Sequence, residues 1–329
     1  MGSNLAASLL ELGKDVTVFD NLYRRGSSEN LAWLNSLGLK LFTHGDIRSP
    51  DDVSRLLIQT QPATIFHLAG QVAMTTSVNN PRMDFEINAL GTLNILEAMR
   101  LHVPDAALVY SSTNKVYGDL EYMEYEENNR RYILVEHPEG LKESTPLDFK
   151  TPYGCSKGSA DQYVRDYAKM FGLNTVVFRH SSIYGSRQFA TADQGWVGWF
   201  CHQALQQKQS PSRFTVSGTG KQVRDVLFAQ DAVQCYLQAG QNAAKYAGEV
   251  FNIGGGISNS LSLLELFDML EQTLGISLEY EHLPERQSDQ KVFVADISKV
   301  QRTLGWTPLI SSHEGVLRTL NWLEQTGKL

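Results

Sequence analysis

The most regular feature of the chain is a succession of short apolar runs that alternate with segments of helical periodicity. Runs rich in β-branched and aromatic residues occupy positions 16–19, 39–43, 64–68, 107–110 and 175–179. Apolar residues recur at helical spacing over positions 83–100 and from Lys157 through Tyr167. Strands that alternate with helices usually pair in parallel, so the pattern predicts βαβ units. We therefore expect an α/β fold, a Rossmann-like doubly wound parallel sheet with a smaller α/β lobe.

The periodicity weakens after Arg179, where Gly, Ser, Gln and aromatic residues dominate. This change predicts two domains, 1–179 and 180–329, with residues 226–250 packing back on the first. In the second domain, positions 251–255 are typical of a strand that runs into a turn. Ser262 and Glu265 form a candidate capping box at the start of a helix. Positions 304–308 indicate a helix end followed by a turn.

Residues 119–143 differ in composition from the rest of the chain. They are rich in Glu, Tyr and Asn and lack periodic apolar residues. The pattern predicts a long surface loop without regular structure. Loops of this length are usually either disordered or functional. The segment lies between residues 111–113 and 153–157, which are candidate catalytic residues. If the loop is functional and not disordered, we expect it to cover a bound substrate.

Composition excludes several classes of protein. With 329 residues, 42% of them hydrophobic, the chain is long enough to bury a large core. A net charge of -7 opposes nucleic-acid binding, and no apolar run reaches the roughly 18 residues of a membrane span. The three cysteines, Cys155, Cys201 and Cys235, have neither metal-ligand nor disulfide spacing. We expect a cytoplasmic protein with no metal site.

The candidate chemistry lies in two segments about forty residues apart, Ser111-Ser112-Thr113 and Tyr153-Gly154-Cys155-Ser156-Lys157. Tyr153 and Lys157 are four residues apart, so on a helix they share a face. A phenol with its ordinary pKa near 10 is a poor base at neutral pH, but a neighbouring ammonium favours its anion. Thr113, at the carboxyl end of a predicted strand, would contact the same substrate hydroxyl. The predicted catalytic residues are Thr113, Tyr153 and Lys157.

Motifs along the whole chain carry a resemblance to a known family. They are Asp20-Asn21, His44-Gly45-Asp46-Ile47-Arg48, Phe66-His67-Leu68-Ala69-Gly70, Asn88, Ser111-Ser112-Thr113, Tyr153-x-x-x-Lys157, Arg224-Asp225-Val226 and Pro284-x-Arg286-x-x-Asp289. Together they resemble the extended short-chain dehydrogenase/reductases, the NAD-dependent epimerases and dehydratases of nucleotide sugars. The resemblance implies NAD as cofactor, a nucleotide-sugar substrate, and a homo-oligomer, dimer or tetramer, formed by the helices near Met83 and Tyr153.

The same resemblance assigns roles to individual residues. It implies that Asp20 holds the adenosine ribose hydroxyls, which favours NAD over NADP, and that Arg224 and Arg286 grip the diphosphate of the substrate. Residues implied in cofactor binding are Gly2, Asp20, Asn21, Asp46, Ile47, Leu68, Ala69, Gly70, Asn88, Ser111, Tyr153, Lys157 and His180. Those implied in substrate binding are Thr113, Ser182, Gln194, Arg224 and Arg286.

Three runs, 68–77, 112–118 and 188–200, resemble a narrower branch that inverts C2 of CDP-linked dideoxy sugars, converting CDP-paratose to CDP-tyvelose. This implies a CDP-sugar as substrate and a place in O-antigen synthesis. A 4-epimerase and a 4,6-dehydratase remain the alternatives, although Asn114-Lys115 stands where dehydratases carry Asp-Glu after the Thr. A non-catalytic NAD-binding or oligomerising protein is the alternative from another class.

The sequence departs from the family pattern in two places. The family begins with a strand and a Gly-rich turn, of which only Gly2 has a counterpart, so about a dozen residues are missing. That turn supplies backbone N–H groups to the pyrophosphate. We expect the gene product to start upstream; if Met1 is the true start, weak NAD binding and poor folding follow. In addition, Ser182 stands where many relatives carry Asn.

Overall fold

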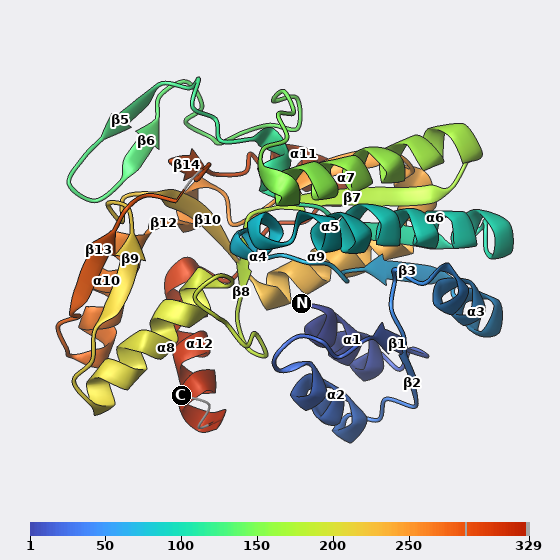
Figure 1. Ribbon diagram of the computed structural model, residues 1–329, viewed down its shortest axis with the longest axis horizontal. Helices are drawn as coiled ribbons and strands as arrows, with labels where there is room; N and C mark the ends of the chain where they lie inside the picture. The colour runs from blue at the N-terminus through green and yellow to red at the C-terminus, as the bar shows by residue number, and fades with distance from the viewer. Residues whose placement is uncertain (287, 327–329) are drawn as a thin grey trace. The chain divides into compact units, whose positions relative to one another are not determined.

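The computed structural model describes residues 1–286 and 288–326, which divide into two compact units (Figure 1). The first unit comprises residues 1–116, 149–179 and 233–251. The second comprises residues 117–148, 180–232 and the described residues from 252 onwards. Residues 117–148 thus belong to the second unit although they precede position 180. The assignment of the units to cofactor and substrate binding stays a prediction.

Parallel strands form the centre of the first unit. The four-stranded sheet has the order β11-β7-β4-β3, made of β11 (Glu249–Ile253), β7 (Asn174–His180), β4 (Ala107–Ser111) and β3 (Thr64–His67). β4 pairs in parallel with both β3 and β7. β1 (Thr17–Asp20) and β2 (Leu41–His44) form a separate two-stranded parallel sheet. The α/β fold with parallel strands predicted from the hydrophobic pattern is confirmed.

Helices pack on both faces of the four-stranded sheet. The first unit contains α1 (Gly2–Glu11), α2 (Ser27–Ser36), α3 (Pro50–Thr60), α4 (Met74–Asn79), α5 (Pro81–Phe85), α6 (Gly91–His102) and α7 (Thr151–Phe171), and part of α9 (Ala229–Gln241). Figure 1 shows α6 and α7 side by side, and Ile65 of β3 faces their core cluster. On the other face, Gly240 of α9 lies against the Phe66 ring, where a Cβ would be only 2.7 Å from it.

The predicted continuous helix over 83–100 is interrupted. α5 ends at Phe85, a π-helical turn spans Glu86–Leu90, and α6 begins at Gly91. The side chain of Asn88, within the π turn, accepts a hydrogen bond from the Gln71 backbone N–H at 2.9 Å. Such turns widen a helix and often occur at functional sites. Asn88 and Gln71 are 17 positions apart in the sequence, so helical periodicity could not predict their contact.

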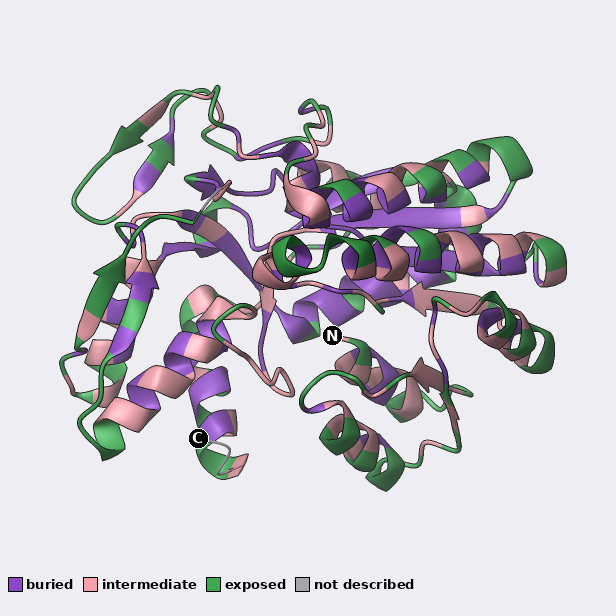
Figure 2. Ribbon diagram, in the orientation of Figure 1, coloured by how far each residue is buried: buried purple, intermediate pink, exposed green. Residues whose placement is uncertain are grey.

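The second unit is organised around β10 (Val223–Phe228). β10 pairs in parallel with β8 (Ser182–Tyr184) and β14 (Val292–Phe293), and antiparallel with β12 (Ser260–Ser262). β9 (Phe214–Ser217) pairs in parallel with β13 (Tyr280–Leu283). The remaining helices are α8 (Trp196–Gln209), α10 (Leu263–Leu274), α11 (Ser298–Leu304) and α12 (Ser312–Thr326). As Figure 2 shows, β10 is almost wholly buried.

Two local signals in the second unit are confirmed. Ser262 caps α10 by accepting a hydrogen bond from the Glu265 N–H, and the Glu265 carboxylate accepts one from the Ser262 N–H. Gly305 adopts a left-handed conformation with φ 69° and ends α11. Both signals depend on neighbours within a few residues, so they can be read from the sequence.

The prediction of a structureless loop over 119–143 is wrong. The segment contains an antiparallel hairpin, formed by β5 (Tyr125–Glu127) and β6 (Tyr132–Leu134). The alternation of its apolar side chains is too short to stand out, because each strand has three residues. Contacts with distant parts of the second unit hold the hairpin in place, beginning with the hydrogen bond from the Tyr132 N–H to the Lys221 carbonyl at 3.0 Å.

A buried ion pair joins α7 to β7. The Arg179 guanidinium donates to both Asp161 carboxylate oxygens, at 2.7 and 2.8 Å. Arg179 is 1% exposed and Asp161 0%, so neither charge is solvated by bulk water. The Ser112 hydroxyl also donates to Asp161, at 2.7 Å. The pair therefore fixes α7 relative to the end of β4.

We expect Arg179→Met to lower the free energy of unfolding by about 3–5 kcal/mol, because it leaves the Asp161 charge buried and unpaired. The control is Arg55→Met, which removes an exposed ion pair with Asp52 and should cost less than about 1 kcal/mol. Urea unfolding followed by circular dichroism measures both. Equal losses in the two variants would contradict the prediction.

Candidate functional site

The end of β4 and the first turns of α7 bring four of the predicted site residues together. α7 begins at Thr151 and carries Tyr153 and Lys157 one turn apart. The Lys157 ammonium donates to the Ser111 carbonyl at 2.5 Å, and the hydroxyls of Thr113 and Tyr153 are hydrogen-bonded. The structure therefore groups Ser111, Thr113, Tyr153 and Lys157 within one unit, as the spacing of the motifs predicts.

Burial makes the Tyr153 phenol a weaker acid than a free phenol. Burial raises its pKa to about 12, the Thr113 hydrogen bond lowers the pKa, and the Asp84 charge raises it. Desolvation of the phenolate is the largest of these effects. That a neighbouring ammonium favours the anion stays a prediction.

Lys157 is buried among aromatic and acidic groups. Burial lowers its pKa to about 7, while Asp161 and Asp84 act in the opposite direction. Its ammonium lies 4.3 Å from the centroid of the Tyr110 ring, a cation–π distance. A lysine in this state exists in both protonation forms around neutral pH.

Sequence reasoning missed a set of buried polar residues behind Lys157. Asn88 was predicted, but its partners Gln71, Asp84 and Ser156 were not. Ser156 donates to Asp84 at 2.5 Å, and the Asn88 amide nitrogen contacts Ser156 at 3.1 Å. Two of these residues could have been suspected from the sequence, because each is a polar residue beside a motif residue. Gln71 follows Gly70, and Ser156 precedes Lys157. Nothing in the sequence marks Asp84.

The residues predicted to bind the adenosine half gather where β1 and β2 end. Asp20 accepts a hydrogen bond from the Leu22 N–H at 2.6 Å. Asn21 donates to Asp46 at 3.0 Å, and Arg48 forms an ion pair with Asp46 at 2.8 Å. The hydrogen bonds from Arg48 lower the Asp46 pKa to about 2, so this carboxylate stays ionised. A carboxylate at a strand end, as at Asp20, suits ribose hydroxyls and repels a further phosphate.

After the end of β3, the backbone at Gly70 packs closely against Asn88 and lies near Lys157. Leu68, Ala69 and Gly70 follow β3, and a Cβ on Gly70 would lie 3.0 Å from the Asn88 side-chain oxygen and 3.9 Å from the Lys157 ammonium. Bare backbone beside a buried lysine fits a dinucleotide cofactor. Ile47 is held farther along by Asn94, which donates to its carbonyl at 2.9 Å. Gly2 is the exposed first residue of α1, and a Cβ there would have no atom within 4 Å.

Three predicted residues lie in the second unit near β10. Arg224 forms an ion pair with Asp289 at 2.7 Å, and the Asp289 N–H donates to the Arg286 carbonyl at 3.3 Å. Arg286 also donates to the Ala192 carbonyl at 3.3 Å, in the turn that Thr191 and Gln194 close. The structure thus links Arg224, Arg286 and the Gln194 turn through Asp289.

Two more predicted residues, His180 and Ser182, lie where β7 ends and β8 begins. His180 ends β7, and its ring nitrogen lies 3.3 Å from the Ser181 carbonyl. Ser182 begins β8 and accepts a hydrogen bond from the Trp196 indole at 2.8 Å. The Ser182 hydroxyl is therefore oriented by α8, and its role toward a substrate stays a prediction.

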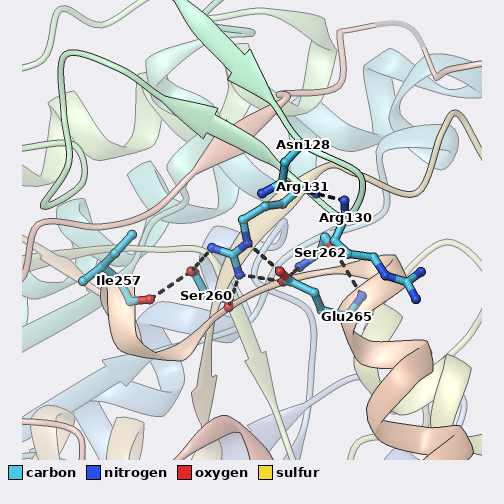
Figure 3. Close-up of polar contacts among 7 residues, drawn as sticks. All are labelled: Asn128, Arg130, Arg131, Ile257, Ser260, Ser262 and Glu265. Atoms are coloured by element: carbon cyan, nitrogen blue, oxygen red, sulfur yellow. Dashed lines mark hydrogen bonds and ion pairs between the residues drawn. The ribbon is translucent and has the colours of Figure 1, made fainter.

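The hairpin β5–β6 is attached to α10 by Arg131 (Figure 3). The Arg131 guanidinium donates to both oxygens of Glu265 at 2.6 Å, and to the Ser260 hydroxyl and carbonyl at 3.0 and 2.9 Å. Glu265 is the same residue that completes the capping box of α10. Arg130 adds an exposed ion pair with Asp268 at 2.9 Å. These long-range contacts explain why the segment is ordered.

The hairpin also lies beside the strand that carries Arg224. Its Tyr132 contacts Lys221, which precedes β10 by two residues. The Lys291 ammonium lies 5.6 Å from the Tyr125 ring and 5.5 Å from the Tyr132 ring. The Arg224 charge lowers the Tyr125 pKa, although burial raises it to about 12 overall. Tyr125 thus lies near Arg224, the residue predicted to bind the diphosphate of the substrate.

The described residues offer neither a metal site nor a membrane-spanning helix. No group of three or more His, Cys, Asp or Glu side chains is arranged to hold a metal ion in 1–286 and 288–326. Over the same residues, no helix combines the length and apolar character that crossing a bilayer requires.

Known proteins are similar to this chain in both sequence and structure. The family model for GDP-mannose 4,6 dehydratase matches residues 1–319. The chain is 58% identical to CDP-paratose 2-epimerase of Salmonella typhi, over 98% of this chain and 96% of that protein. The structure is similar to UDP-glucose 4-epimerase of Thermotoga maritima with UDP-glucose, with a TM-score of 0.83, 28% identity, and coverage of 99% and 96%.

A second solved structure contains the expected cofactor. It is UDP-glucose 4-epimerase of Thermus thermophilus in complex with NAD, with a TM-score of 0.80, 28% identity, and coverage of 98% of this chain and 95% of that chain. The match over residues 1–319 covers all the motifs, and within them Thr113 is hydrogen-bonded to Tyr153 and Lys157 to the Ser111 carbonyl. The chain belongs to the extended short-chain dehydrogenase/reductase family of nucleotide-sugar epimerases and dehydratases.

Proposed function

We propose that this protein inverts C2 of a CDP-linked dideoxy sugar, converting CDP-paratose to CDP-tyvelose with NAD as a bound cofactor. The 58% identity to CDP-paratose 2-epimerase over nearly the whole chain carries this proposal. The grouping of Thr113, Tyr153 and Lys157 supports it, because oxidation of a sugar hydroxyl needs a base at that hydroxyl. Asn114 and Lys115, which replace an acidic pair, argue against the elimination of water.

In the proposed reaction, the residues of the chain handle the proton. Asp20, Asn21 and Asp46 would hold NAD, which when bound would supply a hydride acceptor and donor for C2 and a positive charge that favours the Tyr153 phenolate. Tyr153 takes the proton of the C2 hydroxyl while Thr113 hydrogen-bonds the same oxygen. Lys157 supports the phenolate electrostatically. When hydride is returned to C2 of the 2-keto sugar, Tyr153 returns the proton to the C2 oxygen, so no net oxidation or reduction results.

Retention of the keto sugar is proposed to depend on Arg224 and Arg286. The intermediate must turn over relative to the hydride donor, so it needs a remote anchor that leaves the ring free. A guanidinium binds phosphate oxygens with two parallel hydrogen bonds. Arg224 is paired with Asp289, which a diphosphate would replace as its acceptor. Ser182, Gln194 and His180 are proposed to contact the sugar or the cofactor beside these anchors.

We expect Tyr153→Phe to lower kcat by about 10²–10⁴-fold, because the proton acceptor is lost while the ring stays in place. Proton NMR of CDP-paratose incubated with enzyme and NAD measures inversion at C2 without net NADH. Tyr163→Phe, on the exposed side of the same helix, is the matched control and should keep the parent rate. If Tyr153→Phe is as fast as the parent enzyme, Tyr153 is not the base.

The hairpin β5–β6 is proposed to be a wall of the nucleotide-sugar site. Its attachment through Arg131 keeps Tyr125 beside Arg224, where the diphosphate is proposed to bind. The hairpin is already ordered before substrate binds, so binding does not lose the conformational entropy of ordering it. Preorganisation of this kind strengthens binding without changing the chemical step.

Arg131→Ala should therefore raise KM for the CDP-sugar by about tenfold with kcat within about threefold, since only binding is weakened. Arg130→Ala is the control, because it removes the adjacent and more exposed ion pair with Asp268. Initial rates over a range of CDP-sugar concentrations separate the two constants. Equal KM values for the two variants would show that the hairpin is no part of the site.

We also propose that the protein is a homo-oligomer. Tyr163, Met170 and Phe171 on α7 and Leu101 on α6 are exposed apolar side chains on neighbouring helices. Met170→Glu should lower the mass measured by sedimentation to that of the monomer, because it places a charge in the proposed contact. Ile58→Glu, at an equally exposed position on α3, should leave the mass unchanged.

The proposed compartment is the cytoplasm. Cys155, Cys201 and Cys235 are free thiols. Burial raises the pKa of Cys201 to about 12, so that thiol is inert, whereas Cys155 is exposed. An exposed thiol without a disulfide partner is typical of a reducing compartment.

A further inference from the structure

Behind Lys157 lies a buried carboxylate, Asp84, to which the proposed chemistry gives no role. Asp84 is 0% exposed. Three side chains surround it: the Gln71 amide nitrogen at 2.8 Å, the Asn88 amide nitrogen at 3.2 Å and the Ser156 hydroxyl at 2.5 Å. All these residues belong to the first unit.

Hydrogen bonds farther out fix the direction of these contacts. The Asn88 oxygen accepts from the Gln71 N–H at 2.9 Å, so its NH₂ group is the one that faces Asp84. The Gln71 oxygen accepts from the Ala73 N–H at 2.5 Å, so its NH₂ group also faces Asp84. Asp84 therefore receives only donors, an arrangement that suits a carboxylate. Burial raises the Asp84 pKa, and the hydrogen bonds from Ser156, Gln71 and Asn88 and the Lys157 charge lower it.

The charges around Lys157 balance only when Asp84 is included. Lys157 and Arg179 are the cations, at 4% and 1% exposure, and Asp84 and Asp161 are the anions, both at 0%. Arg179 holds Asp161 with two hydrogen bonds. Asp84 has no cation within 4.0 Å among the residues that the structure describes. The four charges sum to zero, and removal of Asp84 leaves one positive charge without compensation.

We propose that Asp84 is a positioning residue: its carboxylate is the buried counter-charge that holds Lys157 as an ammonium ion beside Tyr153. A buried lysine that loses its counter-charge releases its proton readily. Asp84 also fixes the turn of α7 that carries both residues, because Ser156 donates to Asp84 and contacts the Tyr153 carbonyl at 3.1 Å. The kinetic consequences rest on the proposed epimerase function, whereas the ionisation of Lys157 does not.

The other groups that face Lys157 do not replace Asp84. Tyr110 and Tyr153 are neutral phenols whose pKa burial raises. Burial and the Lys157 charge lower the His67 pKa to about 3, so His67 is neutral. Asp161 raises the Lys157 pKa, but it shares its charge with Arg179. Removal of Asp84 should therefore move the Lys157 pKa below about 7.

The test is Asp84→Asn, with Glu86→Gln as the control two residues along, where the carboxylate pairs with exposed Arg82. Carbon NMR of ε-labelled lysine reports the Lys157 titration directly, and its signal is assigned by its absence in Lys157→Met. Asp84→Asn should shift that titration down by about one pH unit or more, and Glu86→Gln should not shift it. An unchanged titration overturns the proposal, whether or not the protein is an epimerase.

Kinetics separate a charge effect from general damage. In Asp84→Asn the alkaline limb of kcat should move to lower pH, with about a tenfold loss at pH 8 that largely disappears near pH 6. KM for the CDP-sugar should stay within about twofold of the parent value. A loss of kcat that is equal at every pH would show that Asp84 only supports the structure, and would overturn the proposal.

A double variant decides the question if Asp84→Asn does not fold. Asp84→Asn/Lys157→Met removes both charges, so the buried group is again neutral. The double variant should fold and have a higher urea midpoint than Asp84→Asn alone, because the uncompensated charge is gone. If it fails to fold while Lys157→Met folds, hydrogen bonding alone explains Asp84 and the counter-charge is refuted.

Discussion

The site depends on the burial of one ammonium group. Lys157 has to lie beside Tyr153 to influence it, and that position is inside the protein, where burial lowers the lysine pKa to about 7. A protein stabilises such a charge with opposite charges nearby. Asp161 is engaged by Arg179, and Asp84 is enclosed by amide and hydroxyl donors. The donors around Asp84 come from three places: the π turn at Glu86–Leu90, the amide of Gln71 and the start of α7.

Much of the fold around this site could be predicted because its signals are local. The runs at 64–68, 107–110 and 175–179 became β3, β4 and β7, since alternating strands and helices leave a strong pattern. Tyr153 and Lys157 share a face because helical geometry places residues four apart together. The capping box at Ser262 and the left-handed Gly305 also depend on only a few neighbours.

The remainder depends on contacts that are distant in sequence. Asp84 and Ser156 are 72 residues apart, and Arg131 and Glu265 are 134 apart. No periodicity links such positions, so the predicted helix over 83–100 missed its π turn and the predicted loop over 119–143 missed its hairpin. The same holds for Tyr153, because burial is the largest cause of its raised pKa. Spacing shows which residues meet, but the cost of removing them from water depends on the whole fold.

The hydrogen bonds of the arginines in the second unit distinguish an arginine that stabilises the fold from those proposed to bind substrate. Arg131 has two carboxylate oxygens at 2.6 Å, together with the hydroxyl and carbonyl of Ser260, so an incoming anion would have to break a complete set of bonds. Arg224 pairs with a single Asp289 oxygen at 2.7 Å, and Arg286 is exposed with contacts of 3.3 Å. Exchange of one carboxylate for a diphosphate conserves charge pairing at Arg224. Arg131 therefore holds the hairpin, while Arg224 and Arg286, which make fewer bonds to carboxylates, remain the residues proposed to bind the diphosphate.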